Sequence, residues 1–248
     1  AVALGETLNA TGGLWFGWSG DIVEGGTPGE GEVHTSQAGN VTLATIDLCR
    51  EDHDSYYLGY SNGVLWPVFH YRLDLADFDA GFIGGYRRVN QLFARKLMPL
   101  LKPDDTIWVH DYHLIPLAAE LRAMGCTNRI GFFLHIPLPE YNEVWQQGNC
   151  LGEKNEPVCC PRLNTGLFAA LHLAGNVRGV FAGHDHINDY EGTLHAIRLC
   201  YGRATGFNNY GREDFLHGAR VIRLDEAAPD FTTWLRLDDG SRIDRPAA

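Results

Sequence analysis

The spacing of apolar residues predicts alternating strands and helices in the first part of the chain. Three short, largely apolar runs are typical of strands: residues 41–46, 106–110 and 130–134. One helical pattern covers 86–101, where the apolar positions are Val89, Leu92, Phe93, Leu97 and Leu100. A second helix is expected at 114–124. Strand, helix and strand in this order predict a βαβ unit with parallel strands, whose carboxyl ends are the usual place for a ligand.

A different pattern follows residue 142. Residues 143–161 are polar, rich in cysteine and irregular, as a long active-site loop would be. After them we expect a helix at 165–174 and a strand at 177–182. Further short strands are predicted at 195–201, 219–224 and 232–237, with glycine turns between them. The second half is therefore predicted to be β-rich and mostly antiparallel. Near the start, the glycine-rich residues 25–39 are predicted to form a surface loop.

Composition narrows the class of protein. The 248 residues are 45% hydrophobic, which is enough for a packed core, and suggest one large domain or two small ones. With 31 acidic against 20 basic side chains, the formal net charge of −11 argues against a nucleic-acid surface. No apolar run reaches the roughly 20 residues of a membrane span, and the first residues, Ala1–Glu6, lack the pattern of a signal peptide. We therefore expect a cytoplasmic protein without nucleic-acid or membrane partners. In that compartment the six cysteines would stay reduced, although their even number permits disulfides, and no Cys-x-x-Cys spacing for zinc or redox chemistry occurs.

Four long motifs stand in order in the first part of the chain. They are Gly-Gly-Leu-Trp-Phe-Gly-Trp-Ser-Gly (12–20), Tyr-Tyr-Leu-Gly-Tyr-Ser-Asn with Leu-Trp-Pro-Val-Phe-His (56–62 and 65–70), Trp-Val-His-Asp-Tyr-His-Leu-Ile-Pro (108–116) and Arg-Ile-Gly-Phe-Phe-Leu-His-Ile-Pro (129–137). Through these motifs, residues 1–137 resemble the N-terminal half of the trehalose-6-phosphate synthases, glycosyltransferase family 20. The resemblance implies an incomplete Rossmann-like sheet of the GT-B N-terminal type.

The same resemblance implies roles for particular residues. In that family, glucose passes from a UDP-sugar to glucose-6-phosphate with retention of configuration. By motif position, Tyr57 and Trp66 would contact the acceptor phosphate, Asp111 would bind sugar hydroxyls and His135 would lie beside the transferred glucose. Neutral O–H and N–H donors suit a phosphate oxygen, and a carboxylate can accept two hydroxyls. Other sequence stands where the donor-binding domain would follow, so we expect a half-site for a sugar phosphate without full transferase activity.

Motifs of a second kind begin near the end of the first set. They are His-Ile-Pro-Leu-Pro-Glu-Tyr (135–141), Asn-Thr-Gly-Leu-Phe (164–168) and Gly-His-Asp-His-Ile-Asn-Asp-Tyr (183–190). Residues 132–248 thereby resemble the C-terminal half of the calcineurin-like, purple-acid-phosphatase-type metallophosphoesterases. The resemblance implies metal ligands at His135, His184 and His186, and phosphoester hydrolysis is the alternative function. Three imidazoles without a bridging carboxylate would hold one divalent ion, zinc first by ligand preference, with manganese or iron as alternatives.

Two further alternatives stay open on the sequence alone. The missing metal ligands could come from Asp111 and His113, with Gly20-Asp21 and Gly39-Asn40 as the other matching pairs, although their chain order is scrambled. The chain could also be a non-catalytic, chimeric binder of sugar phosphate or metal. In either case the expected fold class is α/β. The predicted domains are an acceptor half-domain at 1–138 and the β-rich half of a metallophosphoesterase sandwich at 139–248.

Overall fold

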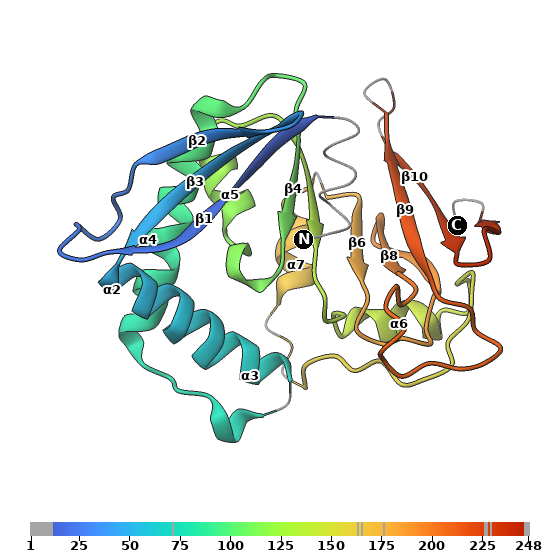
Figure 1. The fold of residues 1–248 in the computed structure, drawn as a ribbon. Helices are drawn as coiled ribbons and strands as arrows, with labels where there is room; N and C mark the ends of the chain where they lie inside the picture. The colour runs from blue at the N-terminus through green and yellow to red at the C-terminus, as the bar shows by residue number, and fades with distance from the viewer. Residues whose placement is uncertain are drawn as a thin grey trace. The chain divides into compact units, whose positions relative to one another are not determined.

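The computed structural model describes residues 12–70, 72–162, 164, 166–175, 177–225, 228 and 230–245 (Figure 1). The chain divides into two compact units. Unit 1 comprises residues 1–67, 73–103 and 113–127, and unit 2 comprises residues 68–72, 104–112 and 128–248. The first residues, on which the absence of a signal peptide was predicted, lie outside the described part of the chain.

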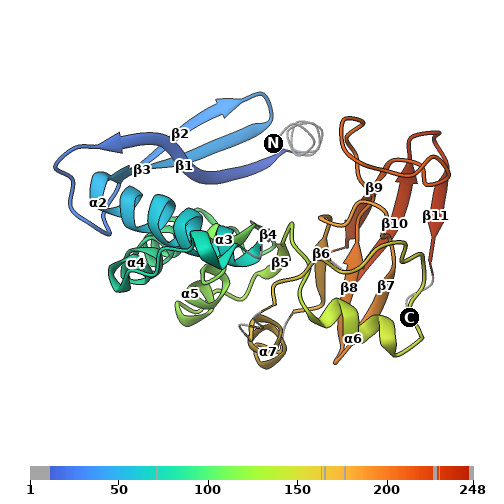
Figure 2. The same cartoon turned by 90° about the horizontal axis from the view of Figure 1, so that it is seen from below.

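Unit 1 contains a three-stranded sheet with helices on one of its faces (Figure 2). Its elements are β1 (Gly13–Val23), β2 (Val33–Ala38), β3 (Val41–Cys49), α2 (Arg50–Asp52), the π-helical η1 (His53–Leu65), η2 (Leu73–Leu75), α4 (Ala80–Leu97), η3 (Met98–Leu100) and α5 (Leu117–Ala123). The central strand, β3, pairs in parallel with β1 and antiparallel with β2. Two short helices, α3 (Trp66–Phe69) and η4 (Tyr112–Leu114), contain residues of both units.

Helix α4 provides much of the core of unit 1. Asp79 caps its first turn, where Oδ1 accepts a hydrogen bond of 2.6 Å from the Gly81 N–H. Phe93 on its buried face contacts Phe16 of β1 edge to face, with 5.6 Å between the ring centroids. Two turns earlier, α4 and η1 approach so closely that a Cβ at Gly85 would lie 1.9 Å from Ser55 Oγ. Only glycine allows this packing of the two helices.

Unit 2 is organised around a five-stranded sheet with the order β4-β5-β6-β8-β7. The strands are β4 (Thr106–His110), β5 (Arg129–Phe133), β6 (Gly179–Ala182), β7 (Glu191–Leu194) and β8 (Ile197–Tyr201). The first four strands in the sheet order run parallel, and β7 pairs antiparallel with β8. Helix α6 (Glu140–Gln146) lies beside β6 and β8, and its Tyr141 hydroxyl bonds to the carbonyls of Val180 and Cys200 (Figure 2).

A second sheet of unit 2 is fully antiparallel. Its strands are β9 (Gly218–Leu224), β10 (Phe231–Leu237) and β11 (Arg242–Asp244), with β10 in the centre. Phe231 of β10 contacts Phe181 of β6, with 5.2 Å between the ring centroids, so the two sheets of this unit share a hydrophobic cluster. A short helix, α7 (Leu167–Leu173), precedes β6.

Most predicted elements are confirmed, and the α/β class with them. The strand predicted at 106–110 has the bounds of β4, and the predicted helices correspond to α4, α5 and α7. The loop predicted at 25–39 is partly wrong, because Val33–Ala38 form β2. This strand is almost entirely exposed, and it pairs through its backbone with β3. The second half is mostly antiparallel, as predicted, and the exception is β6, which pairs in parallel on both sides.

The division into units differs from the predicted domains at 1–138 and 139–248. Strands β5 and β6 lie on opposite sides of that predicted boundary and are hydrogen-bonded neighbours in one sheet. The register pairs Phe132 with Val180 and Phe133 with Phe181. Residues 128–138 consequently belong to the same unit as the chain that follows them.

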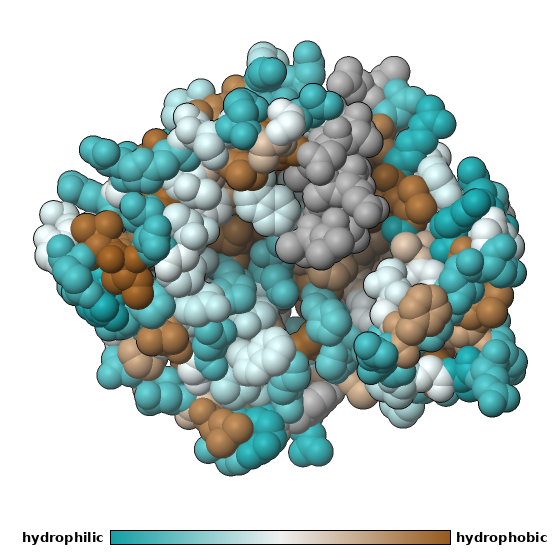
Figure 3. Space-filling view, in the orientation of Figure 1, coloured by the Kyte–Doolittle hydropathy of each residue, from teal (hydrophilic) through white to brown (hydrophobic). Residues whose placement is uncertain are grey.

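Polar side chains cover most of the face shown in Figure 3, and the hydrophobic residues on it form separate patches. Several large apolar side chains of unit 1 are exposed: Leu58, Trp66, Leu73, Leu75, Phe78 and Ile83. In the described residues, no helix combines the length and apolar character that a membrane span requires.

Candidate functional site

Tyr57, predicted to contact a phosphate, lies in a cluster of four rings in unit 1. The ring of His113 stacks on it, with 5.5 Å between centroids and 20° between planes. His53 is also stacked on Tyr57 at 5.7 Å, and Trp18 of β1 lies 5.1 Å away at a tilt of 54°. We call Trp18, His53, Tyr57 and His113 the ring cluster. It joins the strand β1, the helix η1 and the turn after β4.

Trp66 lies at the start of α3, nine residues after Tyr57 on the same continuous helical stretch. A π-helix has roughly 4.4 residues per turn, so nine residues make about two turns and bring both side chains to one face. Trp66 is 45% exposed, whereas Tyr57 is half-buried. An indole with this exposure presents apolar surface that a sugar ring can cover.

The other two predicted sugar ligands belong to unit 2. Asp111 follows the last residue of β4 and has φ of 65°, a left-handed conformation that few residues other than glycine adopt. Its N–H donates to the Phe133 carbonyl at 2.8 Å, and its Oδ1 accepts from the Tyr112 N–H at 2.9 Å. This geometry turns the chain sharply at the carboxyl end of the parallel strand. Burial lowers the pKa of His135, and the nearby charge of Asp111 opposes part of this shift.

His135 contacts His184, one of its two predicted metal partners. Its ring contacts His184 at a centroid distance of 5.2 Å, and its carbonyl accepts hydrogen bonds from the N–H groups of Gly183 and His184. A further histidine, His70, packs edge to face on His184 at 5.9 Å. The sequence reasoning missed His70, because it belongs to a motif of the first family and only folding brings it to His184.

The ring neighbour of His186 is a tyrosine, Tyr210. Its ring stacks on Tyr210 at 4.2 Å, and its Nδ1 lies 3.1 Å from the Tyr210 carbonyl. The Tyr210 hydroxyl in turn donates to Glu156 at 2.9 Å. Among the residues that the structure describes, no three histidine, cysteine, aspartate or glutamate side chains are arranged to hold a metal ion. The metal site at His135, His184 and His186 therefore stays a prediction.

The alternative ligand pairs are distributed over both units. Asp21 lies in β1 and Asn40 in the turn between β2 and β3, both in unit 1, whereas Asp111 lies in unit 2. His113 belongs to unit 1 and takes part in the ring cluster. The neighbour of the His113 ring is thus the aromatic side chain of Tyr57, and the use of His113 as a replacement metal ligand stays a prediction.

The histidine pair predicts a pH dependence of stability. Partial desolvation, followed by the neighbouring His184, lowers the pKa of His135, and partial desolvation likewise lowers the pKa of His184. Asp111 opposes part of the shift at His135. Below pH 6.5, the usual imidazole pKa, the unfolded chain then binds more protons than the folded one, so the free energy of unfolding falls as the pH falls.

We expect this loss to be present in urea unfolding curves recorded between pH 7.5 and 5.5. The double variant His135→Gln/His184→Gln should depend less on pH than the wild type, whereas the exposed His172→Gln should keep the wild-type slope. Equal slopes for the double variant and the wild type would contradict the assignment.

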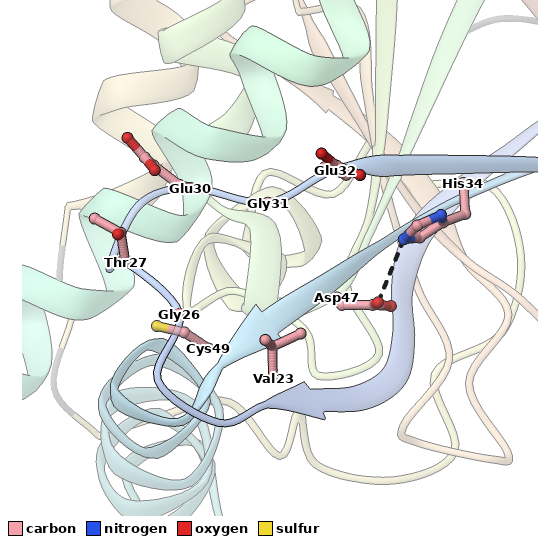
Figure 4. Close-up of a pocket in the computed structure, with 9 residues that line it drawn as sticks. All are labelled: Val23, Gly26, Thr27, Glu30, Gly31, Glu32, His34, Asp47 and Cys49. Atoms are coloured by element: carbon pink, nitrogen blue, oxygen red, sulfur yellow. Dashed lines mark ion pairs between the residues drawn. The ribbon is translucent and has the colours of Figure 1, made fainter.

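Unit 1 also contains an acidic pocket of about 300 Å³ (Figure 4). It is lined by Val23, Gly26, Thr27, Glu30, Gly31, Glu32, His34, Asp47 and Cys49. His34 Nε2 faces Asp47 Oδ2 at 3.3 Å, while Glu30 and Glu32 point away from this pair. None of the predicted site residues lines the pocket, and its carboxylates would repel a phosphate. The pocket therefore lends no support to a sugar-phosphate site in this place.

Comparison with known proteins identifies the family. The model of "Glycosyltransferase family 20" matches residues 1–156. The trehalose-6-phosphate synthase of Cronobacter sakazakii is 55% identical over 139 residues, which are 56% of this chain and 28% of that protein. This chain thus spans less than a third of that relative.

Solved structures of trehalose-6-phosphate synthases are also similar to this chain. The α,α-trehalose-phosphate synthase (UDP-forming) of Burkholderia xenovorans, in complex with glucose-6-phosphate, matches with a TM-score of 0.61 and 35% identity, over 84% of this chain and 46% of that one. A structure from E. coli bound with UDP-2-fluoro glucose matches with a TM-score of 0.55 and 42% identity, over 73% of this chain and 36% of that one. The chain belongs to glycosyltransferase family 20.

Proposed function

We propose that this chain binds the sugar-phosphate acceptor of a trehalose-6-phosphate synthase reaction. In this proposal, Tyr57 and Trp66 donate hydrogen bonds to the phosphate of the acceptor. The observation that supports the proposal is the ring cluster. In it, side chains from three segments, β1, η1 and the turn after β4, pack against the Tyr57 ring. Within the described part of the chain, the Tyr57 hydroxyl makes no hydrogen bond of its own. An ordered O–H donor that has no partner among the described residues, on the same helical stretch as an exposed indole, suits a phosphate oxygen.

The remaining roles belong to the same proposal. Asp111 would accept hydroxyls of a sugar, and His135 would stand beside the glucose that is transferred from UDP-glucose. The Burkholderia relative whose structure contains glucose-6-phosphate and the E. coli structure with a UDP-sugar analogue support these substrate classes. Phosphoester hydrolysis is not proposed, because no group of histidine, cysteine, aspartate or glutamate side chains among the described residues is arranged to hold a metal ion.

Calorimetric titration with glucose-6-phosphate tests the acceptor site. We expect binding by the wild-type chain, and a loss of more than tenfold in affinity for Trp66→Ala, because a hydrogen bond to a charged group is worth about 1.5–3 kcal/mol. Trp66→Phe separates the N–H from the ring area, and Leu58→Ala, an exposed position on the same helix, should leave the affinity unchanged. Absence of heat with the wild type, or equal affinities of wild type and Trp66→Ala, would refute the proposal.

A further inference from the structure

One residue of the ring cluster, His113, has no ligand-binding role in the proposed function, although its ring packs directly on Tyr57. His113 lies on the turn after β4 and is half-buried, and its ring is nearly parallel to that of Tyr57. It also touches Tyr56 edge to face, with 6.4 Å between the centroids. All three residues belong to unit 1. His113 therefore packs against the flat face of the Tyr57 ring, whose hydroxyl is the proposed hydrogen-bond donor to the phosphate.

The backbone of His113 is itself held by a buried side chain. Asn90 of α4 is 0% exposed, and its Nδ2 donates to the carbonyls of His113 at 3.2 Å and of Tyr86 at 2.9 Å. A buried amide that bonds the turn to the helix interior restricts the position of the turn. Asn90 of α4 thus fixes the backbone of His113, and the His113 ring in turn limits the positions open to the Tyr57 ring.

The other neighbours of Tyr57 are anchored in similar ways. The Trp18 indole N–H donates to the Asp21 carbonyl at 2.9 Å, and His53, which is 8% exposed, has its Nδ1 2.8 Å from Asp54 Oδ1. Two rings fixed by their own hydrogen bonds and a third on a fixed backbone thus contact the Tyr57 ring, whose hydroxyl has no hydrogen-bond partner among the described residues. A donor that is already ordered before the ligand arrives loses less rotational freedom on binding.

We propose that His113, held by Asn90, is a positioning residue that orders the Tyr57 ring for recognition of a sugar-phosphate acceptor. The inference rests on the proposed function for its ligand, but the ordering of Tyr57 is a property of the unliganded chain. Ordering one side chain in advance is worth about two- to tenfold in affinity. His113→Phe keeps an aromatic face for Tyr57, whereas His113→Ala removes it.

Aromatic ¹H–¹³C NMR of the Tyr57 ring, assigned with Tyr57→Phe, tests the ordering without any ligand. We expect ring-current-shifted signals in the wild type and in His113→Phe, and clearly smaller shifts in His113→Ala, where only Trp18 and His53 still contact the Tyr57 ring. Asn90→Ala should give an intermediate shift. Far-UV circular dichroism shows that each variant is folded. If a folded His113→Ala kept the wild-type Tyr57 shifts, the proposal would be overturned.

The consequence for binding is measured by titration with glucose-6-phosphate. His113→Ala should weaken binding two- to tenfold, and His113→Phe should restore it to within twofold of the wild type. A wild type that does not bind refutes the proposed function, while the NMR comparison still decides whether His113 orders Tyr57. A wild type that binds, with His113→Ala showing altered Tyr57 signals and unchanged affinity, would refute the positioning role.

Discussion

Replacing Glu191 by glutamine should be among the most destabilising single substitutions in this chain. Glu191 of β7 is 2% exposed, and its carboxylate pairs with two arginines, with Arg198 at 2.7 Å and with Arg220. Both guanidinium groups are themselves nearly buried. Glu191→Gln keeps the shape of the side chain and removes its charge, so two buried cations lose their counter-ion. Breaking a buried ion pair in this way costs about 3–5 kcal/mol.

Urea denaturation followed by tryptophan fluorescence measures the effect. The matched control is the exposed pair of Arg50 and Glu24, where Glu24→Gln should leave the unfolding midpoint unchanged because solvent screens surface ion pairs. A Glu191→Gln midpoint equal to that of the Glu24→Gln variant would mean that the arginines find other partners or water. Because domains are stable by only about 5–15 kcal/mol, the substitution should remove a large part of the stability of unit 2.

Tyr141→Ala should destabilise the chain by a similar amount, for a different reason. Tyr141 of α6 is 0% exposed and contacts Tyr201 edge to face at 4.8 Å. Its hydroxyl donates to the carbonyls of Val180 and Cys200, and its own carbonyl accepts from Tyr190. Truncating a large buried aromatic side chain to alanine leaves a cavity and costs about 3–5 kcal/mol.

A second variant separates packing from hydrogen bonding. Tyr141→Phe keeps the ring and should cost about 1 kcal/mol, which is the usual net worth of a lost hydrogen bond. Leu173→Ala, at an 83% exposed position of α7, should change the free energy of unfolding by less than about 0.5 kcal/mol. If Tyr141→Phe lost as much stability as Tyr141→Ala, the hydroxyl rather than the ring would anchor α6 to the sheet.

The elements best predicted from the sequence are those whose pattern is local. The short apolar run at 106–110 became β4, since a buried strand needs only a few consecutive apolar residues between polar ends. The helical spacing at 86–101 became α4, although the helix begins earlier, at Ala80, where Asp79 provides the cap. The strands missed near the start, β1 and β2, have mixed or mostly exposed positions and form through pairing with β3.

The candidate site divides in the same way. Its residue types were identified from motifs, because Tyr57, Trp66, Asp111 and His135 stand in a long ordered pattern that chance rarely produces. Their neighbours were not identified. His70 and His184 are far apart in sequence, and so are His186 and Tyr210, and nothing in the local pattern of either segment indicates the contact.

The sequence by itself determined the α/β class, most strands and helices, and the family to which residues 1–156 belong. These properties follow from local periodicity and from motifs that are continuous in the chain. The tertiary structure decided that β5 pairs with β6 across the change of motif, that His186 stacks on Tyr210, and that His113 lies against Tyr57. Each of these depends on contacts between distant segments. Such contacts are set by backbone pairing and by close packing of the whole core, which no short stretch of sequence specifies alone.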